Sequence, residues 1–215
     1  TFTRLADSSA SAKKKRVARR ALGLREDVPT VLIVGGGDGV GRLRLIVEEV
    51  ASTLGRAGFE AQVVVVCGRN QQLQAELRER AWPRNLDVFV EGFVSRMADF
   101  MAAADCLVTK AGPGTIAEAS ICGLPVMLSG HLPGQETGNV KHVLRSGFGA
   151  YSRKPRVIAN TVTRWLREPE TRARLATRAR AAARPLATEA IARDVIELLY
   201  SVPRSSASAV AVPAL

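Results

Sequence analysis

The sequence predicts an α/β protein built on a parallel β-sheet, and two observations lead to this fold class. First, the predicted strands are continuous runs of Val, Ile and Leu, as in TVLIV and AQVVVV, rather than alternating apolar and polar residues. Strands that are covered on both faces have this pattern. Second, a segment with helical spacing separates each strand from the next, which is the β–α order of parallel sheets. We therefore expect a Rossmann-like, doubly wound sheet of about six strands with right-handed connections.

The first half of the chain supplies three of these strands. The strand at 30–34 runs into the glycine-rich loop GGGDGVG, and 42–57 has helical periodicity. A second strand at 61–68 is followed by a helix at 71–80, and the third strand covers 86–93. The apolar residues of the first helix recur three and four positions apart, which is the spacing of one helix face.

The second half continues the same order. It contains a short helix at 95–103 with Ser95 as its expected N-cap, a strand at 105–110, a helix at 113–122 that starts at Pro113, a strand at 125–130, a helix at 137–146 and a short strand at 149–152. Three helices follow, at about 155–167, 170–183 and 187–200, with Pro169 and Pro185 as breaks. They are extra C-terminal helices on the sheet domain.

The domain organisation follows from composition. Residues 1–12 are small and polar and are expected to be disordered, and so is the low-complexity tail 201–215. Residues 13–200 form one binding domain. The length of 215 residues and the hydrophobic content of 47% fit a normal globular core.

The charge of the chain implies an acidic partner. The formal net charge is +11 and the isoelectric point is about 10.5. Nucleic acid, an anionic bilayer and an anionic substrate all fit such a charge. Aromatic residues make up only 5% of the chain, and no zinc-finger spacing or RNA-binding aromatic signature is present. The sequence therefore disfavours nucleic acid.

The three cysteines, Cys67, Cys106 and Cys122, stand alone in apolar surroundings. We interpret them as reduced core thiols rather than as metal ligands or disulfides. No apolar run approaches the roughly 20 residues of a membrane span, and no signal peptide is visible. Because the chain begins at Thr1 rather than Met, we expect a fragment, and targeting information could lie upstream.

Polar and glycine-rich motifs gather at the carboxyl ends of the strands, where open α/β sheets bind ligands. The loop at 35–41 is neither a G-x-G-x-x-G motif nor a P-loop, and packing of a tight turn and close approach of a ligand explain it equally well. Asp38 would repel a phosphate there.

The turn AGPGT is the better phosphate site. Gly112 and Gly114 lack a Cβ atom, so backbone N–H groups can approach an anion, and the helix that begins at Pro113 directs its positive end to the same place. Lys110 adds charge. The alternative is a plain turn between a strand and a helix.

Two further motifs suit sugar hydroxyl groups. Glu118 lies one turn into the helix and could accept hydrogen bonds from a ribose, although a solvent-exposed Glu that faces the helix dipole is the alternative. The loop PGQETGN offers Gln135, Glu136 and Asn139, and its alternative is a polar surface loop. Phe93 could pack on a flat base. Residue chemistry thus predicts a nucleotide or phosphosugar site.

Taken together, the motifs carry a family resemblance. GGGDGVG, VCGRN, GFVSRM, TKAGPGTIAEA, GLPV and PGQETGN occur in one order and spacing that resembles the C-terminal half of monogalactosyldiacylglycerol synthases. These are inverting glycosyltransferases of the GT-B fold in family 28, related to the peptidoglycan glycosyltransferase that makes lipid II. The resemblance covers about Ala18 to Leu199, and Asp38 departs from it, since Glu is usual there.

The resemblance implies a donor half that binds UDP-galactose. In such enzymes the uracil lies against the segment that matches Gly92, Phe93 and Val94, the diphosphate on the turn Gly112–Thr115, and the ribose on Glu118. The hexose is held by Gln135 and Glu136. The complete set of expected substrate-binding residues is Gly37, Gly39, Arg69, Phe93, Val94, Gly112, Gly114, Thr115, Glu118, Gln135, Glu136 and Asn139.

The resemblance also implies an activity. Galactose would pass from UDP-galactose to 1,2-diacylglycerol with inversion, without a metal or other cofactor. The catalytic base belongs to the N-terminal half, so we expect no catalytic residue here and no activity from this half alone. The alternatives are a related lipid glycosyltransferase, either a diacylglycerol glucosyltransferase or a lipid II-type enzyme, and a non-enzymatic basic α/β module that binds nucleic acid.

The sequence KKKRVARRALGL, residues 13–24, predicts a basic helical segment. A lipid-modifying enzyme works at a bilayer, which gives the KKKRVARR part a second interpretation as a contact for anionic lipids. Its alternative is a solvated, partly disordered basic segment. We expect a peripheral membrane protein, at the plastid envelope in a plastid-bearing eukaryote and at the cytoplasmic membrane face in a bacterium.

Overall fold

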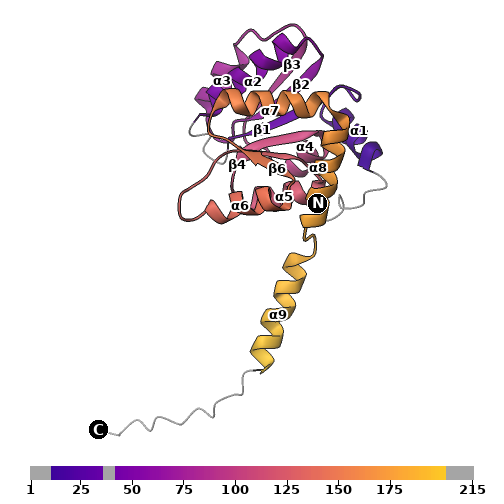
Figure 1. Cartoon of the computed structure of the whole chain (residues 1–215), viewed down its shortest axis with the longest axis vertical. Coiled ribbons are helices and arrows are strands. Elements are labelled where there is room, and N and C mark those ends of the chain that lie inside the picture. Colours follow the sequence, from indigo (N-terminus) through magenta and orange to yellow (C-terminus); the bar gives the residue numbers. More distant parts are fainter. Residues whose placement is uncertain (1–10, 36–41, 202–215) are drawn as a thin grey trace, which may run out of the picture. The chain divides into compact units, whose positions relative to one another are not determined.

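The computed structural model describes residues 11–35 and 42–201 (Figure 1). The chain divides into two compact units, residues 1–183 and 184–215. The first unit holds the sheet and its covering helices. The second contains α9 (Ala187–Ser201). The sequence placed this helix inside the binding domain, whereas the structure groups it with the second unit.

The sheet has six strands, all paired in parallel in the order β3-β2-β1-β4-β5-β6. Their bounds are β1 (Thr30–Val34), β2 (Ala61–Val66), β3 (Leu86–Glu91), β4 (Cys106–Lys110), β5 (Val126–Gly130) and β6 (Gly149–Tyr151). This is the doubly wound arrangement that the sequence predicts, and each strand lies within one or two residues of its expected position.

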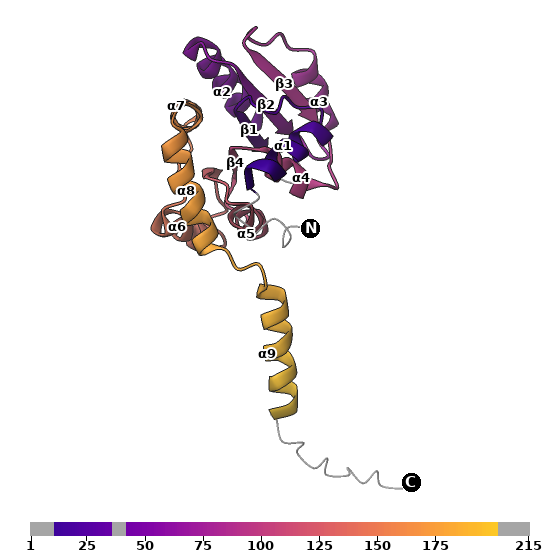
Figure 2. The same ribbon diagram turned by 90° about the vertical axis from the view of Figure 1, so that its right-hand side faces the viewer.

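Helices cover both faces of the sheet (Figures 1 and 2). The core on one face includes side chains of α2 (Leu43–Ala57), α3 (Gln71–Arg78) and α7 (Pro155–Arg167), and α2 packs against α7. The core on the other face includes side chains of α1 (Ser11–Ala21), α4 (Met97–Ala103), α5 (Pro113–Cys122) and α6 (Thr137–Ser146). The last helix of the unit, α8 (Pro169–Ala182), adds Leu175 to the first core and Ala179 to the second.

The two cores explain the continuous apolar strands. In β1, Val31 and Ile33 belong to one core and Leu32 to the other, and all three are almost completely buried. Every residue of β2 is buried as well. Since successive side chains of a strand point to opposite faces, both faces of these strands need apolar residues.

The basic segment near the N-terminus is an ordered helix fixed to the sheet. Arg19 is buried; its guanidinium donates to the carbonyl oxygen of Ala103 at 2.9 Å and to that of Glu26 at 2.6 Å, and it pairs with Asp105 at 2.6 Å. Lys15 pairs with the other oxygen of Asp105 at 2.6 Å. The interpretation as a partly disordered segment is therefore wrong. Helix α1 starts at Ser11, so residues 11 and 12 do not belong to a disordered terminus.

Asp105 is the centre of this attachment. It precedes β4 at the amino edge of the sheet and also accepts a hydrogen bond from the Thr30 N–H at 2.8 Å. Burial alone would raise the pKa of this carboxyl, but the charges of Lys15 and Arg19 and the hydrogen bonds outweigh burial and lower the pKa below its ordinary value. The ion pair thus holds α1, β1 and β4 together.

The sequence misplaces one helix start. The N-cap of α4 is Arg96, and no side chain caps the helix, so the prediction of Ser95 as the cap is wrong. The Arg96 guanidinium instead pairs with Asp99 at 2.5 Å.

The three thiols are free, as expected for a reduced core. Cys67 and Cys106 are buried, and Cys122 is partly buried. Burial raises the pKa of Cys67 to about 11 and that of Cys122 to about 12, although Arg78 lowers the first and Arg180 the second by a smaller amount. Burial also raises the pKa of Cys106 far above its ordinary value.

Candidate functional site

The carboxyl ends of the strands form one edge of the sheet, and most of the predicted site residues follow those ends. The strand order reverses beside β1, which lies between β2 and β4, and a ligand crevice is expected at such a point. Two predicted residues, Gly37 and Gly39, lie outside the described residues. The other ten lie in the loops and first helical turns that follow β2, β3, β4 and β5.

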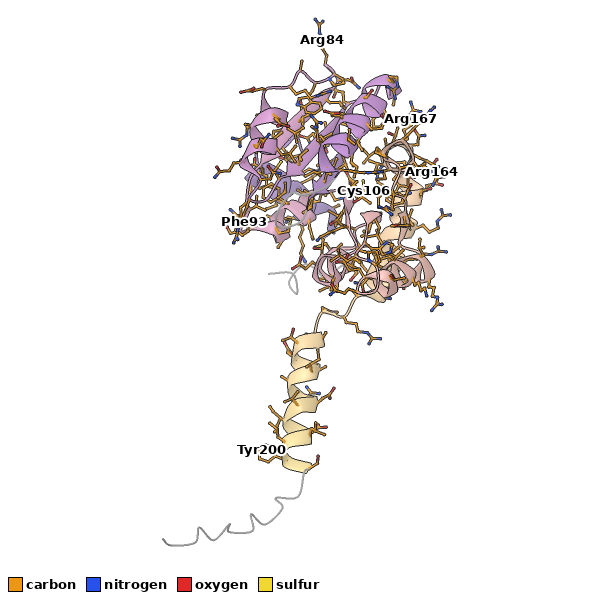
Figure 3. The ribbon with its side chains drawn as sticks, turned by 90° about the vertical axis from the view of Figure 1, so that its left-hand side faces the viewer. Arg84, Phe93, Cys106, Arg164, Arg167 and Tyr200 are labelled. Carbon is orange, nitrogen blue, oxygen red and sulfur yellow. The ribbon has the colours of Figure 1, made fainter. Side chains whose placement is uncertain are left out.

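An exposed aromatic ring stands at one end of this edge. Arg69 follows β2 and Phe93 follows β3, and the register pairs Val66 with Glu91, so the two loops are neighbours. The Arg69 guanidinium lies 5.6 Å from the centre of the Phe93 ring, and Phe93 is 68% exposed. Figure 3 shows Phe93 at the surface, away from Arg84 at the opposite end of the domain. Val94 packs against the core and supports this loop.

The turn between β4 and α5 has two glycines that the fold does not explain. Gly112 is the N-cap of α5 with φ −67° and ψ 130°, and neither Gly112 nor Gly114 has a positive φ. A Cβ atom built on Gly114 would meet no described atom within 4 Å, and one on Gly112 would meet only the Thr115 hydroxyl at 3.9 Å. The space beside both glycines leaves the backbone of this turn accessible to a ligand.

The helix behind this turn directs its amino end toward the same edge. Thr115 is partly exposed in the first turn of α5, and Glu118 follows one turn later, partly buried. Burial raises the pKa of the Glu118 carboxyl. A half-desolvated carboxylate gains from added hydrogen-bond donors, and ribose hydroxyls are suitable donors.

The loop after β5 is held by two of its own polar residues. The Glu136 side chain is buried, and its Oε2 accepts a hydrogen bond from the Leu132 N–H at 2.8 Å. The Asn139 Nδ2 donates to the Ala111 carbonyl at 2.9 Å, which ties the start of α6 to the turn after β4. Of the three polar residues predicted in this loop, Gln135 is the exposed one.

A cavity of about 330 Å³ lies at the ends of β1, β4 and β5. Its lining includes Arg42, Lys110, His131 and Arg153, and no Asp or Glu is among the described lining residues. The Arg42 guanidinium donates to the Arg153 carbonyl at 3.1 Å, which joins the start of α2 to the loop after β6. A cavity with this lining attracts an anion.

Sequence reasoning missed three of these four residues, since only Lys110 was noted. His131 directly follows β5, so its position at a strand end was a signal available in the sequence. Arg42 entered the sequence analysis only as the first residue of the helical segment 42–57. Arg153 follows the three-residue strand β6, and nothing in the sequence marked it.

The described residues show neither a membrane span nor a metal site. Across 11–35 and 42–201, no helix combines the length and apolar character needed to cross a bilayer. In the same part of the chain, no three His, Cys, Asp or Glu side chains gather as metal ligands would.

Comparison with known proteins agrees with this picture. Residues 30–191 match the model of the glycosyltransferase family 28 C-terminal domain. The chain is 43% identical over 162 residues to the chloroplastic monogalactosyldiacylglycerol synthase of Spinacia oleracea, and 41% identical over 201 residues to monogalactosyldiacylglycerol synthase 1 of Arabidopsis thaliana. These alignments cover 72% and 89% of this chain but only 30% and 37% of the relatives, so the chain spans about a third of their length.

Solved structures share the fold. The crystal structure of Acinetobacter baumannii MurG superimposes with a TM-score of 0.66 at 24% identity, over 86% of this chain and 52% of MurG. The family model covers the whole sheet and its carboxyl edge. The chain belongs to the glycosyltransferase family 28 C-terminal domain, in the α/β architecture of GT-B glycosyltransferases.

Proposed function

We propose that this chain is the donor-binding half of an inverting glycosyltransferase that moves galactose from UDP-galactose to 1,2-diacylglycerol. The geometric observation that carries the donor site is the turn after β4, where two glycines leave the backbone at the start of α5 open to a ligand. The names of the relatives support galactose and diacylglycerol, because plant monogalactosyldiacylglycerol synthases are 40–45% identical to this chain.

Each part of the donor has a place in this proposal. The uracil lies against Phe93 beside Arg69, the diphosphate lies at Gly112–Thr115, and the ribose hydroxyls meet Glu118. Gln135 reaches the hexose, while Glu136 and Asn139 shape its loop through the hydrogen bonds to Leu132 and Ala111. The half contributes by holding the donor and stabilising the departing diphosphate, which are positional and electrostatic effects.

The acceptor and the catalytic base belong to a part of the protein that this chain does not include. Peripheral contact with anionic lipids, at a plastid envelope or a bacterial membrane, completes the proposal. Helix α1 is a weaker candidate for that contact than its sequence suggested. Four of its cations, Lys15, Arg16, Arg19 and Arg20, already pair with carboxylates of this domain.

The donor site is tested by adding a methyl group to the open turn. UDP should bind the wild-type chain, and Gly114→Ala should weaken that binding at least about tenfold, because the new Cβ occupies the space of the phosphate. The fold should be unharmed, since Ala is the better helix former by about 1 kcal/mol. Calorimetry with UDP and a thermal melt measure the two effects.

Gly138→Ala is the matched control. Gly138 is the second residue of α6 as Gly114 is of α5, and a Cβ atom there also meets no described atom within 4 Å. This variant should bind UDP like the wild type. Equal UDP affinity for Gly114→Ala and wild type would remove the turn from the donor site.

A further inference from the structure

His131 and Tyr151 form a pair at the wall of the cationic cavity. His131 directly follows β5, and Tyr151 ends the neighbouring strand β6. The His131 Nδ1 lies 3.1 Å from the Tyr151 hydroxyl oxygen, and the two rings meet edge to face with 5.4 Å between their centres. Both side chains are partly buried. The ring of His131 is therefore held in one orientation.

The hydrogen bond to Tyr151 selects which nitrogen of His131 meets a ligand. Either the tyrosine hydroxyl donates to Nδ1, or Nδ1–H donates to the hydroxyl oxygen. An anion in the cavity favours the first arrangement, because the imidazole proton then sits on Nε2 and can be donated to that anion. The pair thus supplies an N–H donor without requiring a charged imidazole.

The other charged residues of the cavity favour the same ligand. Arg42 comes from the start of α2, Lys110 from the end of β4 and Arg153 from the loop after β6, so three elements direct cations to one place. At about 330 Å³ the cavity has room for a phosphate group or a single sugar ring. Lys110 also starts the turn that holds Gly112 and Gly114, so the cavity adjoins that turn.

We propose that His131, oriented by Tyr151, donates a hydrogen bond from Nε2 to the terminal phosphate of the bound nucleoside diphosphate. This proposal rests on the proposed function, because it takes the nucleoside diphosphate as the ligand. Arg42, Lys110 and Arg153 supply the surrounding positive charge. His131 is then a residue that distinguishes a diphosphate from a monophosphate.

The test compares the affinities of three ligands for the full 215-residue chain. Calorimetry is run with UDP, UMP and uridine on wild type and on His131→Asn, which removes the Nε2 donor. Loss of one hydrogen bond to a charged group should weaken UDP about tenfold or more. UMP and uridine should bind both proteins equally, since neither has a terminal phosphate in the cavity.

A spectroscopic measurement separates this role from a structural one. The chain has only two histidines, so ¹⁵N-histidine spectra are simple to assign. At a pH where the ring is neutral, His131 should be the Nε2-protonated tautomer, and saturating UDP should shift its Nε2 signal. Tyr151→Phe removes the partner of Nδ1 and should lower the population of that tautomer and weaken UDP, while UMP stays unchanged.

His142→Asn is the matched control. His142 is the other histidine and lies exposed on α6, with its ring edge-on to Phe148. This variant should bind UDP like the wild type. Failure of the wild type to bind UDP would overturn the proposed function itself. Tight UDP binding that His131→Asn leaves unchanged, or weakens together with UMP, would overturn only the role of His131.

Discussion

Asp105 shows how one residue fixes the N-terminal helix. Its side chain is 10% exposed, and those of its partners Lys15 and Arg19 are 29% and 5% exposed. In ion pairs this buried, removal of one partner strongly destabilises the folded state, because the other partner stays buried as an uncompensated charge. Without Asp105, the buried guanidinium of Arg19 would lose its carboxylate partner.

Asp105→Asn should therefore lower the free energy of unfolding by about 3 kcal/mol. The pKa of Asp105 is lowered in the folded state. Its contribution is thus complete above the ordinary aspartate pKa of about 4 and is lost as the pH falls through the folded value. Urea unfolding at pH 7 and at several lower pH values checks both points.

The control is Asp27→Asn, which removes the exposed pair of Asp27 with Arg16. A change of about 0.5 kcal/mol or less is expected, because exposed pairs contribute little. If the two variants destabilise the protein equally, Asp105 does not hold α1 in place.

Gln135 and Glu136 are neighbours in sequence but differ in environment. Glu136 is buried and binds the Leu132 N–H, so Glu136→Ala leaves a backbone donor unpaired and should cost about 1–3 kcal/mol of stability. Gln135 is exposed and should tolerate Ala. Chemical denaturation of the two variants distinguishes these costs.

In the complete enzyme, Gln135→Ala is then the cleaner test of sugar binding. Turnover of UDP-galactose should fall about tenfold, because the variant loses one hydrogen bond to the hexose. Inhibition by UDP, which has no hexose, should stay unchanged. A parallel loss of UDP inhibition would show that the loop serves the nucleotide rather than the hexose.

Position 149 in the edge strand β6 has room only for glycine. A Cβ atom on Gly149 would lie 2.2 Å from the Val126 carbonyl oxygen and 2.5 Å from a methyl carbon of Val143. The backbone of β5 and the side chain of α6 thus leave no room for a larger residue. Gly149→Ala should destabilise the protein by about 1–3 kcal/mol through overpacking.

Gly130→Ala serves as its comparison, since Gly130 ends β5 and a Cβ atom there meets no described atom within 4 Å. Thermal melts of the two variants should differ by several degrees. Equal melting temperatures would mean that β6 shifts to admit the methyl group at little cost.

The sequence predicts elements of this protein better than their attachments. The inner strands β1, β2, β4 and β5 follow from apolar runs, because burial on both faces demands apolar residues, whereas the edge strands β3 and β6 are mostly only partly buried. Helix α1 is different, since its basic composition suggests solvent and only the fold brings Asp105 to Arg19, 86 residues away. The start of α4 is also not visible in the sequence, because no side chain caps that helix.

The sequence likewise predicts some residues of the candidate site and not others. Gly112, Gly114, Phe93 and Gln135 lie exposed or partly exposed at the edge where the sequence predicts them. Arg42, His131 and Arg153 line the cavity from three separate parts of the chain, and no local sequence pattern predicts that these parts lie together.

At the scale of the whole molecule, the division into two compact units predicts that the first unit folds without the second. Helix α9 carries six exposed large hydrophobic side chains, among them Ile191 and Leu199. Tyr200 is another, and Figure 3 labels it. A chain that ends after Ala183 should therefore melt at the same temperature as the full chain, within about 2 °C.

Calorimetry also tests this truncation through ligand binding, because the residues of the proposed donor site belong to the first unit and UDP affinity should be preserved. A truncated chain that fails to fold would mean that α9 completes the first core. Neither chain should transfer galactose, since the catalytic base is expected in the half that is absent, and product formed by either would contradict that expectation.

The raised pKa values of the three thiols make the protein well suited to site-specific labelling. Maleimides and disulfide reagents react with the thiolate, and at neutral pH the native cysteines supply almost none, since Cys67 and Cys122 ionise near 11 and 12. A single new cysteine at an exposed position outside the proposed donor site, such as Arg84, would then be the one reactive thiol of the described chain. A fluorophore could be attached there without removal of any native cysteine and without loss of a proposed donor contact.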